Sequence, residues 1–348
     1  MEMMKAAVLT NIGKIELQQR ERPQPKPDEV QVKVEYVGIC GSDVHYFEFG
    51  RVGNFVVKKP IVLGHECGGT VTAVGSAVKK CKVGDRVALE PGVPCGKCEY
   101  CLSGRYNLCP DVRFMATPPY DGAFQEYVVH PEALTFLLPD GMSTMAGALI
   151  EPLAVGFHAA KQSGASVGQS AVVLGAGCIG LVTMMALHSM GVKKVIVADL
   201  LPKRLEKAKE LGASAVINSG ETDVEQAVLS LTDGAGADLV FETAGSPVTA
   251  MMTSFLVRRG GTITLVGMTP KPEFSYNFGN IMDKEATIKS VFRYCNLYPT
   301  AISAVACGDI PIEKIVSDTF PFDHAQEAMQ YNIDHKADVT KIVLDFTK

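Results

Sequence analysis

The sequence contains no run of roughly 18 consecutive apolar residues, which excludes a helix that crosses a membrane. It has no block of basic residues and a formal net charge of −5, so nucleic acid is not an expected partner. Its first residues lack the basic flank and the apolar run of a signal peptide, and we therefore expect a cytoplasmic protein. The composition, 47% hydrophobic and 20% charged, is that of an ordinary globular protein, and a length of 348 residues favours two domains.

Cysteine is sparse for a disulfide scaffold of this size, with ten residues in the chain. Four of them nevertheless lie close together, at Cys95, Cys98, Cys101 and Cys109. In a reducing compartment such a cluster more often binds a metal than forms disulfides. Four thiolates at this spacing can reach the corners of one tetrahedron, and they leave no open position for a substrate. We therefore predict a closed structural zinc site.

A second candidate metal site begins with Cys40, which is followed 25 positions later by His65 and Glu66. Zinc favours thiolate, imidazole and carboxylate ligands, and a catalytic site keeps one position open. The alternative is a buried cysteine and a histidine at a strand end, without a metal. Glu151 stands among apolar residues, where a carboxylate is costly unless it is solvated, paired or bound to a cation. Its alternative role is that of a surface glutamate at a helix start.

The first 140 residues have the pattern of an all-β domain. Residues 29–37 alternate polar and apolar side chains, the period of a half-buried strand. Residues 68–75 and 84–89 continue the β pattern, and glycine and proline mark the turns. A strand at residues 341–345 suits a return of the chain to this domain. We therefore expect a catalytic zinc-binding β domain made of residues 1–150 and 286–348.

The pattern of the next segment is typical of a dinucleotide-binding turn. A short apolar strand at residues 171–174 ends in Gly175-Ala176-Gly177-Cys178-Ile179-Gly180, and an apolar helix follows. The glycines permit a tight turn, close approach of the backbone to a pyrophosphate and close helix packing, and the helix N-terminus favours the anion. The next strand ends in Asp199, which is placed to accept hydrogen bonds from the adenosine ribose and to repel a 2′-phosphate. This predicts NAD, and Arg204 either stacks on adenine or is a solvated helix residue.

Strands and helices continue to alternate as far as residue 266. Five strands with crossover helices predict a doubly wound parallel sheet, and we expect this domain to comprise residues 151–285. The whole chain is therefore predicted to be an α/β protein.

The quoted residues resemble those of the zinc-dependent medium-chain dehydrogenases over essentially the full length of the chain, and within them the polyol (sorbitol and xylitol) dehydrogenase branch. The segments that carry the resemblance are residues 38–46, 50–59, 64–66, 106–110, 151–153 and 291–294. The resemblance implies a GroES-like catalytic domain joined to a Rossmann domain. It also implies two zinc ions per chain and, since tetramers are common among relatives, a homotetramer.

The resemblance implies a catalytic zinc held by Cys40 and His65, with Glu66 and Glu151 close by. Whether each glutamate binds the zinc directly or through water stays open. For the cofactor, the implied contacts are Gly175, Gly177, Ile179, Gly180, Asp199, Arg204, Val266, Gly267, Met268, Phe292 and Arg293. For the substrate they are Tyr46, Glu151, Arg293 and Tyr294.

The resemblance implies the oxidation of a polyol such as sorbitol or xylitol to a ketose, with hydride transfer to NAD. Ser42 and His45 are candidates to carry the released proton towards solvent, although Ser42 is equally suited to a turn. One alternative is a zinc dehydrogenase for threonine or a simple alcohol. Another is a non-enzymatic dinucleotide-binding protein that has kept the fold, against which the joint presence of Cys40, His65, Glu66 and Glu151 argues.

Overall fold

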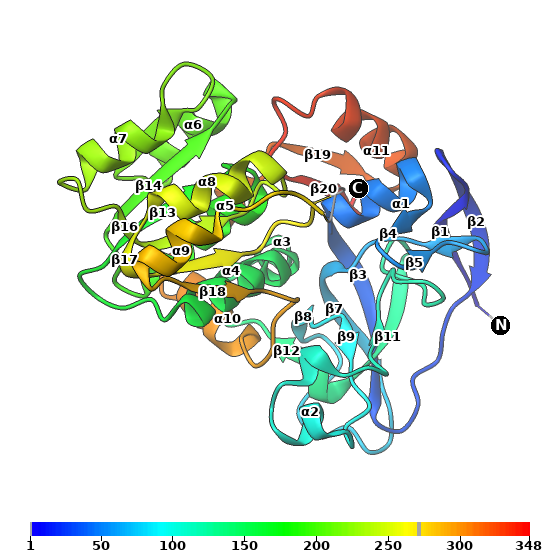
Figure 1. The fold of residues 1–348 in the computed structure, drawn as a ribbon. Coiled ribbons are helices and arrows are strands. Elements are labelled where there is room, and N and C mark those ends of the chain that lie inside the picture. The colour runs from blue at the N-terminus through cyan, green and yellow to red at the C-terminus, as the bar shows by residue number, and fades with distance from the viewer. Residues whose placement is uncertain (1, 270–272) are drawn as a thin grey trace. The chain divides into compact units, whose positions relative to one another are not determined.

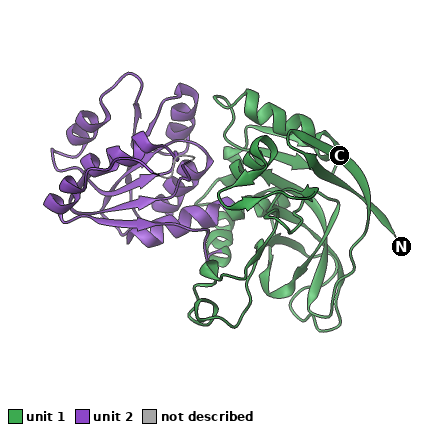
Figure 2. Ribbon diagram, turned by 45° about the vertical axis from the view of Figure 1, so that its right-hand side comes forward, with its two compact units in different colours: residues 1–151, 298–348 green, residues 152–297 purple. Residues whose placement is uncertain are grey.

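The computed structural model describes residues 2–269 and 273–348, which form two compact units (Figure 2). Unit 1 comprises Met1–Glu151 and Tyr298–Lys348, and unit 2 comprises Pro152–Leu297. Residues 286–297, which the sequence analysis assigned to the catalytic domain, thus group with unit 2. Residues 1 and 270–272, which fall inside the expected domain ranges, lie outside the described residues. Within the described ranges, no helix is both long and apolar enough to cross a membrane.

A seven-stranded sheet is the centre of unit 1. Its strand order is β12-β8-β7-β3-β20-β19, and β11 also pairs with β3. The strands are β3 (Glu29–Ile39), β7 (Glu66–Val74), β8 (Arg86–Leu89), β11 (Tyr127–Pro131), β12 (Thr135–Leu137), β19 (Asp318–Pro321) and β20 (Ile342–Asp345). Strand β20 runs antiparallel to β3 with Ile342 opposite Ile39, so the C-terminal segment returns to this domain as predicted (Figure 1).

Three smaller sheets complete the β structure of unit 1. They have the orders β2-β1-β6, β10-β9 and β4-β5. The strands are β1 (Met3–Asn11), β2 (Lys14–Glu21), β4 (Arg51–Val52), β5 (Phe55–Val56), β6 (Ile61–Val62), β9 (Gly92–Val93) and β10 (Arg113–Phe114). One hydrophobic core joins β1, β3, β6 and β7 to the C-terminal segment, through side chains such as Val34, Leu63 and Leu344. Cys40 and His65, which flank β3 and β7, are therefore positioned by strands of this core.

Unit 1 also contains helices. They are α1 (Gly41–Phe49), α2 (Glu99–Leu102), α3 (Thr144–Ala148), α10 (Tyr298–Ala306) and α11 (Ala325–Asp334), with short 3-10 turns η1 (Tyr106–Leu108), η2 (Glu132–Leu134), η3 (Ile312–Ile315) and η4 (Phe322–His324). Helix α4 (Ile150–Ser163) begins at the end of unit 1 and continues into unit 2.

The prediction that the first 140 residues are all-β was wrong at α1. This helix begins after Cys40, where the Asp43 carboxylate accepts a hydrogen bond from the Cys40 backbone N–H at 3.0 Å. It ends at Gly50, whose φ of 66° suits glycine and whose N–H bonds the Tyr46 carbonyl. The buried residues of α1 include the polar Asp43 beside Val44 and Phe47. The sequence of α1 therefore lacks the apolar face by which an amphipathic helix is predicted.

Unit 2 is built on a six-stranded sheet whose pairings are all parallel, with the order β15-β14-β13-β16-β17-β18. The strands are β13 (Ser170–Leu174), β14 (Lys194–Asp199), β15 (Ala215–Asn218), β16 (Ala237–Glu242), β17 (Val257–Leu265) and β18 (Thr287–Ser290). The five predicted strands are present. The sixth, β18, was missed because all four of its residues are exposed, so it has no buried side to give an apolar period.

The helices of unit 2 lie between these strands in the chain, as the predicted doubly wound fold requires (Figure 1). They are α5 (Cys178–Ser189), α6 (Pro202–Glu210), α7 (Val224–Leu231), α8 (Pro247–Leu256) and α9 (Phe278–Lys284). A buried core of strand and helix residues, including Val172, Val228 and Ile263, holds the sheet to the helices that cover it. The parallel order places β13 next to β14 and β16, so the loops that follow these strands meet at one edge.

Candidate metal and dinucleotide sites

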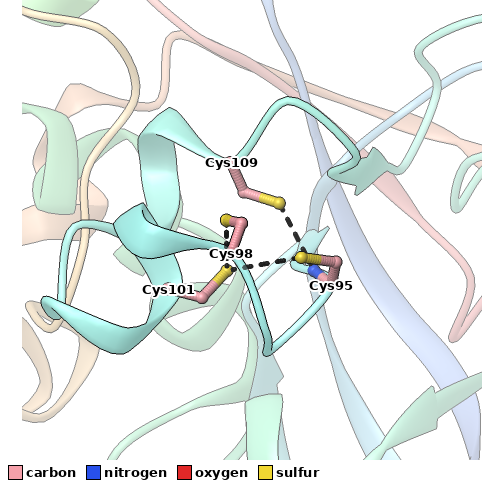
Figure 3. A group of neighbouring side chains, drawn as sticks. All are labelled: Cys95, Cys98, Cys101 and Cys109. Atoms are coloured by element: carbon pink, nitrogen blue, oxygen red, sulfur yellow. Dashed lines mark hydrogen bonds between the residues drawn. The ribbon is translucent and has the colours of Figure 1, made fainter.

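Figure 3 shows the four predicted cysteine ligands gathered around one point. The sulfur atoms of Cys95, Cys98, Cys101 and Cys109 all lie within 4.8 Å of one another. The Sγ–Sγ distance is 3.4 Å between Cys98 and Cys101 and 3.9 Å between Cys95 and Cys101. Cys98 precedes α2, Cys101 lies in it, and Cys109 follows η1, so two short turns bring the sulfurs together.

The electrostatics of this group suit a cation. Backbone N–H groups of Lys97 and Cys98 lower the pKa of Cys95 to about 7, which favours a thiolate at neutral pH. Burial and hydrogen bonding to the neighbouring sulfurs raise the pKa of Cys101 to about 12. Four thiolates so close together repel one another, and a divalent ion between them offsets that repulsion. Four sulfur donors at this spacing can surround one ion tetrahedrally, which suits zinc. The arrangement thus fits the structural metal that the sequence predicts.

A second group of ligand atoms comes from Cys40, His65 and Glu66, which also lie within 4.8 Å of one another. Cys40 follows β3, His65 precedes β7, and Glu66 is the first residue of β7. Strands β3 and β7 pair with Gly38 opposite Glu66, which explains how residues 25 positions apart meet. A Cβ atom at Gly38 would lie 1.9 Å from Glu66 Oε2, so only glycine leaves room for the carboxylate.

Asp43 is part of this site, although the sequence analysis gave it no role. Its fully buried carboxylate lies 3.6 Å from His65 Nδ1 and accepts hydrogen bonds from the Gly64 and Cys40 N–H groups, both at 3.0 Å. Burial acts to raise its pKa, but the attraction of His65 and these hydrogen bonds hold the pKa below its ordinary value. A carboxylate behind a histidine orients the ring and leaves the other nitrogen for a metal. Its position three residues after Cys40, typical of a helix-capping carboxylate, was the available signal.

The pKa of His65 responds to the same neighbours. Burial acts to lower it, but the charges of Asp43 and Cys40 hold the pKa well above the ordinary value. These negative neighbours therefore favour a positive charge at the position of the ring. A metal bound to the neutral ring supplies that charge.

Lys341 is the second residue that the sequence analysis missed. Its ammonium donates hydrogen bonds to both Glu66 carboxylate oxygens, at 2.7 and 2.8 Å, and to the Ile39 carbonyl at 3.0 Å. A lysine next to a short strand is expected at the surface, because lysine is rarely buried unless it is paired. No local feature of the sequence predicts the burial of Lys341.

Glu151 lies in the first turn of α4 and is buried. Within the described residues, the group of converging ligand atoms contains Cys40, His65 and Glu66 but not Glu151. A third carboxylate, Glu90, follows β8 and accepts a hydrogen bond from the Tyr106 hydroxyl at 2.7 Å. Burial raises the pKa of Glu90 to about 7, and the charge of Glu151 acts in the same direction. The sequence analysis gave no role to Glu90, which continues an apolar strand and has no local signal.

The other predicted residues of this unit belong to α1. Ser42 and His45 are partly buried, and the His45 ring contacts Phe49 edge-on with centroids 5.8 Å apart. Tyr46 is buried. One helix thus carries the two candidate proton carriers and Asp43, which lies beside His65.

In unit 2 the glycine-rich turn has the geometry that its sequence predicts. Gly175 has a φ of 104°, a conformation that favours glycine. A Cβ atom at Gly180 would lie 1.8 Å from the Gly175 carbonyl oxygen, so helix and strand approach as closely as the backbone allows. Gly177 is the N-cap of α5, and Ile179 lies in its first turn. The turn presents a helix N-terminus at the carboxyl end of β13, where a pyrophosphate binds in such folds.

Asp199 ends β14 beside this turn. One carboxylate oxygen accepts a hydrogen bond from the Ala176 N–H at 2.6 Å and the other from the Leu201 N–H at 2.9 Å. Asp199 therefore braces the turn, and its contact with the ribose stays a prediction. The guanidinium of Arg204 lies beside the turn, 3.7 Å from the point that a Cβ of Gly177 would occupy.

The remaining predicted contacts are also in unit 2. Val266, Gly267 and Met268 follow β17, and a Cβ at Gly267 would lie 2.3 Å from the Gly245 nitrogen. Beyond β18, the Arg293 guanidinium lies over the Phe292 ring, 4.8 Å from its centroid, and Arg293 has a φ of 55°. Tyr294 is buried next to it in the chain.

Two families match the sequence. Residues 26–140 match the alcohol dehydrogenase GroES-like domain, and residues 178–306 match the zinc-binding dehydrogenase domain. Sorbitol dehydrogenase from Bacillus subtilis (strain 168) is 44% identical over 341 residues, which cover 98% of this chain and 97% of that protein.

Two solved structures have the same fold over almost the whole chain. An oxidoreductase of unknown specificity from Escherichia coli is 47% identical, with a TM-score of 0.96 and full coverage of both chains. A zinc-binding dehydrogenase from Sinorhizobium meliloti 1021, bound to NADP, is 32% identical, with a TM-score of 0.92 over 99% of this chain and 100% of that one.

Proposed function

The chain belongs to the zinc-dependent medium-chain dehydrogenases, and from that membership we propose that it oxidises a secondary hydroxyl of a polyol such as sorbitol or xylitol to a ketone, with NAD as the hydride acceptor. The observation that carries the proposal is the convergence of Cys40, His65 and Glu66 within 4.8 Å of one another. The 44% identity to a sorbitol dehydrogenase supports a polyol as the substrate.

Cys40, His65 and Glu66 would hold the catalytic zinc, with Glu151 near it, and Cys95, Cys98, Cys101 and Cys109 would hold the structural one. When bound, the catalytic zinc supplies Lewis acidity that makes a secondary hydroxyl easier to deprotonate. Asp43 fixes the His65 ring through Nδ1, so the ligand does not have to reorient during turnover. Ser42 and His45 then pass the hydroxyl proton towards solvent along α1, directly or through water.

Substrate and cofactor contacts complete this proposal. Tyr46, Arg293 and Tyr294 contact the hydroxyls that neighbour the reacting carbon. Asp199 accepts hydrogen bonds from the adenosine ribose, and its charge disfavours a 2′-phosphate. The Sinorhizobium meliloti relative is bound to NADP, so the test of this proposal compares NAD with NADP. We further propose a cytoplasmic homotetramer, because four cysteine ligands need a reducing compartment and tetramers are common in the family.

The test is a panel of substrates with NAD and NADP run side by side. We expect NADH to form with xylitol and sorbitol, much less product with threonine or propan-2-ol, and no product after treatment with a chelator. Equal turnover of a simple alcohol favours the alternative of a zinc dehydrogenase with another substrate. The Escherichia coli relative, whose specificity is unknown, does not decide between these substrates. No turnover of any alcohol favours a non-enzymatic dinucleotide-binding protein.

A further inference from the structure

Lys341 has an unusual environment for a lysine. Its side chain is 3% exposed, and that of its partner Glu66 is 1% exposed. An ammonium has three donors, and here two are directed at the Glu66 oxygens and one at the Ile39 carbonyl. Lys341 immediately precedes β20, which pairs with β3 so that Ile342 lies opposite Ile39. This pairing fixes the backbone next to Lys341 and the backbone of its acceptor Ile39.

Stability alone does not account for this pair. Taking two charges out of water costs several kcal/mol per ion, and a well-packed apolar pair is often as stable or more so. Glu66 is also one of the three residues whose ligand atoms converge at the candidate catalytic metal site. Its carboxylate therefore contacts one cation, the lysine, and belongs to the group of residues that would hold another.

We propose that Lys341 is a positioning residue that limits how strongly Glu66 binds the catalytic metal, an inference that rests on the proposed function for the presence of that metal. By holding both carboxylate oxygens, the ammonium neutralises Glu66 and restrains it against the Gly38 backbone. Glu66 would then remain a weak ligand of the metal and would not also fill the open coordination position that an alcohol needs.

Charge arithmetic gives the direction of the effect. Without the lysine, Glu66 would be an unpaired buried carboxylate next to a divalent ion, and its attraction to that ion would be strong because Glu66 and His65 are both buried. The carboxylate would turn to the metal and raise its coordination number. The metal would bind more tightly and the substrate would compete for it less well.

The experiment compares Lys341→Met, which keeps the length of the side chain without its charge, with Lys341→Arg, which keeps the charge. Zinc release to a chromogenic chelator and the visible spectrum of the cobalt-substituted protein are measured. Cys40→Ser protein, which retains the four-cysteine group, supplies the signal to subtract. We expect Lys341→Met to slow release from the catalytic site about tenfold, the scale of outer-shell effects on metal sites, and to weaken the cobalt absorption as coordination rises.

Two controls separate positioning from a purely structural role. Lys348→Met removes an exposed lysine, paired with Asp345 at 3.4 Å, and should leave release and spectrum unchanged. In a Glu66→Gln background the effect of Lys341→Met should vanish, because the proposed coupling passes through that carboxylate. Lys341→Gln serves as the uncharged variant if Lys341→Met does not fold by circular dichroism.

Release that is unchanged or faster in the uncharged variant overturns the inference, as does an effect that persists in the Glu66→Gln background. A wild-type protein that takes up only one metal per chain, at the cysteine group, refutes the proposed function and this inference with it. If the wild type binds two metals but Lys341→Met shows the same zinc release and cobalt spectrum as the wild type, only the inference is refuted.

Discussion

The Asp43 carboxylate lies 3.6 Å from His65 Nδ1 and is also the acceptor for the backbone N–H groups of Cys40 and Gly64. One buried side chain therefore joins the start of α1 to the loop that carries the histidine. This arrangement fixes two of the three candidate ligands relative to each other before any metal binds. It also connects helix capping, which is a local feature, to the chemistry of the site.

The first prediction concerns Asp43. Asp43→Asn keeps the shape but loses the charge that orients and attracts His65, so we expect zinc affinity at the catalytic site to fall about 10- to 100-fold. Competition with a chelator measures it. Asp323→Asn is the matched control, because Asp323 lies 3.9 Å from His324 Nε2 in an exposed pair, and it should change nothing. Equal affinities in wild type and Asp43→Asn would remove Asp43 from the site.

The second prediction concerns pH and Glu90. Because the pKa of Glu90 is raised from 4.5 to about 7, the unfolded state ionises first as the pH rises. The free energy of unfolding should therefore fall between pH 4.5 and 7 and then stay level, by an amount on the order of 3 kcal/mol. Glu90→Gln, which stays neutral and can still accept from Tyr106, should abolish this part of the pH dependence. Urea titrations of both proteins at pH 5.5 and 8 measure the free energy of unfolding. The same change with pH in wild type and in Glu90→Gln would contradict the prediction.

The third prediction separates the two metal groups. Cys101→Ser should lower the melting temperature and the zinc content, because a closed zinc site contributes to folding. Cys40→Ser should abolish turnover and leave the melting temperature nearly unchanged. Cys307→Ser, at an exposed cysteine, is the control. Metal analysis that finds a single zinc in carefully prepared wild type would rule out the two-site proposal.

The fourth prediction concerns cofactor choice. Asp199→Ala should raise the KM for NAD and narrow the gap to NADP, since it removes both the ribose acceptor and the charge opposed to a 2′-phosphate. The loss of the brace on Ala176 should weaken binding of both cofactors as well. Asp199→Asn, which retains an acceptor, distinguishes the two contributions. A wild type that uses NADP as efficiently as NAD would contradict the role given to the charge.

The fifth prediction concerns the polyol. Arginine offers five donors in a rigid fork that can bind two adjacent hydroxyls. We therefore expect kcat/KM for xylitol or sorbitol to exceed that for propan-2-ol by several orders of magnitude, and Arg293→Ala to reduce this preference. Steady-state kinetics on the three alcohols test it. An unchanged preference in the variant would mean that Arg293 serves the cofactor or the packing on Phe292 instead.

Local patterns in the sequence were enough to determine much of this protein. The spacing of Cys95, Cys98, Cys101 and Cys109 predicted their convergence, because few residues separate them and the chain has little freedom to place them elsewhere. The glycine-rich turn predicted the arrangement around α5 for the same reason. The four cysteines are neighbours in the sequence, while Asp199 reaches the turn because β14 lies next to β13.

Only the tertiary structure decided the residues around the catalytic group. Lys341 is 275 positions from Glu66 in the chain, and it reaches the carboxylate because β20 pairs with β3, which in turn pairs with β7. The pKa of Glu90 is raised by burial, against the hydrogen bond from Tyr106, which acts to lower it, and the pattern of apolar residues in β8 does not predict that burial. Burial and ion pairing at such distances depend on which strands become neighbours, and that choice is made by the packing of the whole sheet.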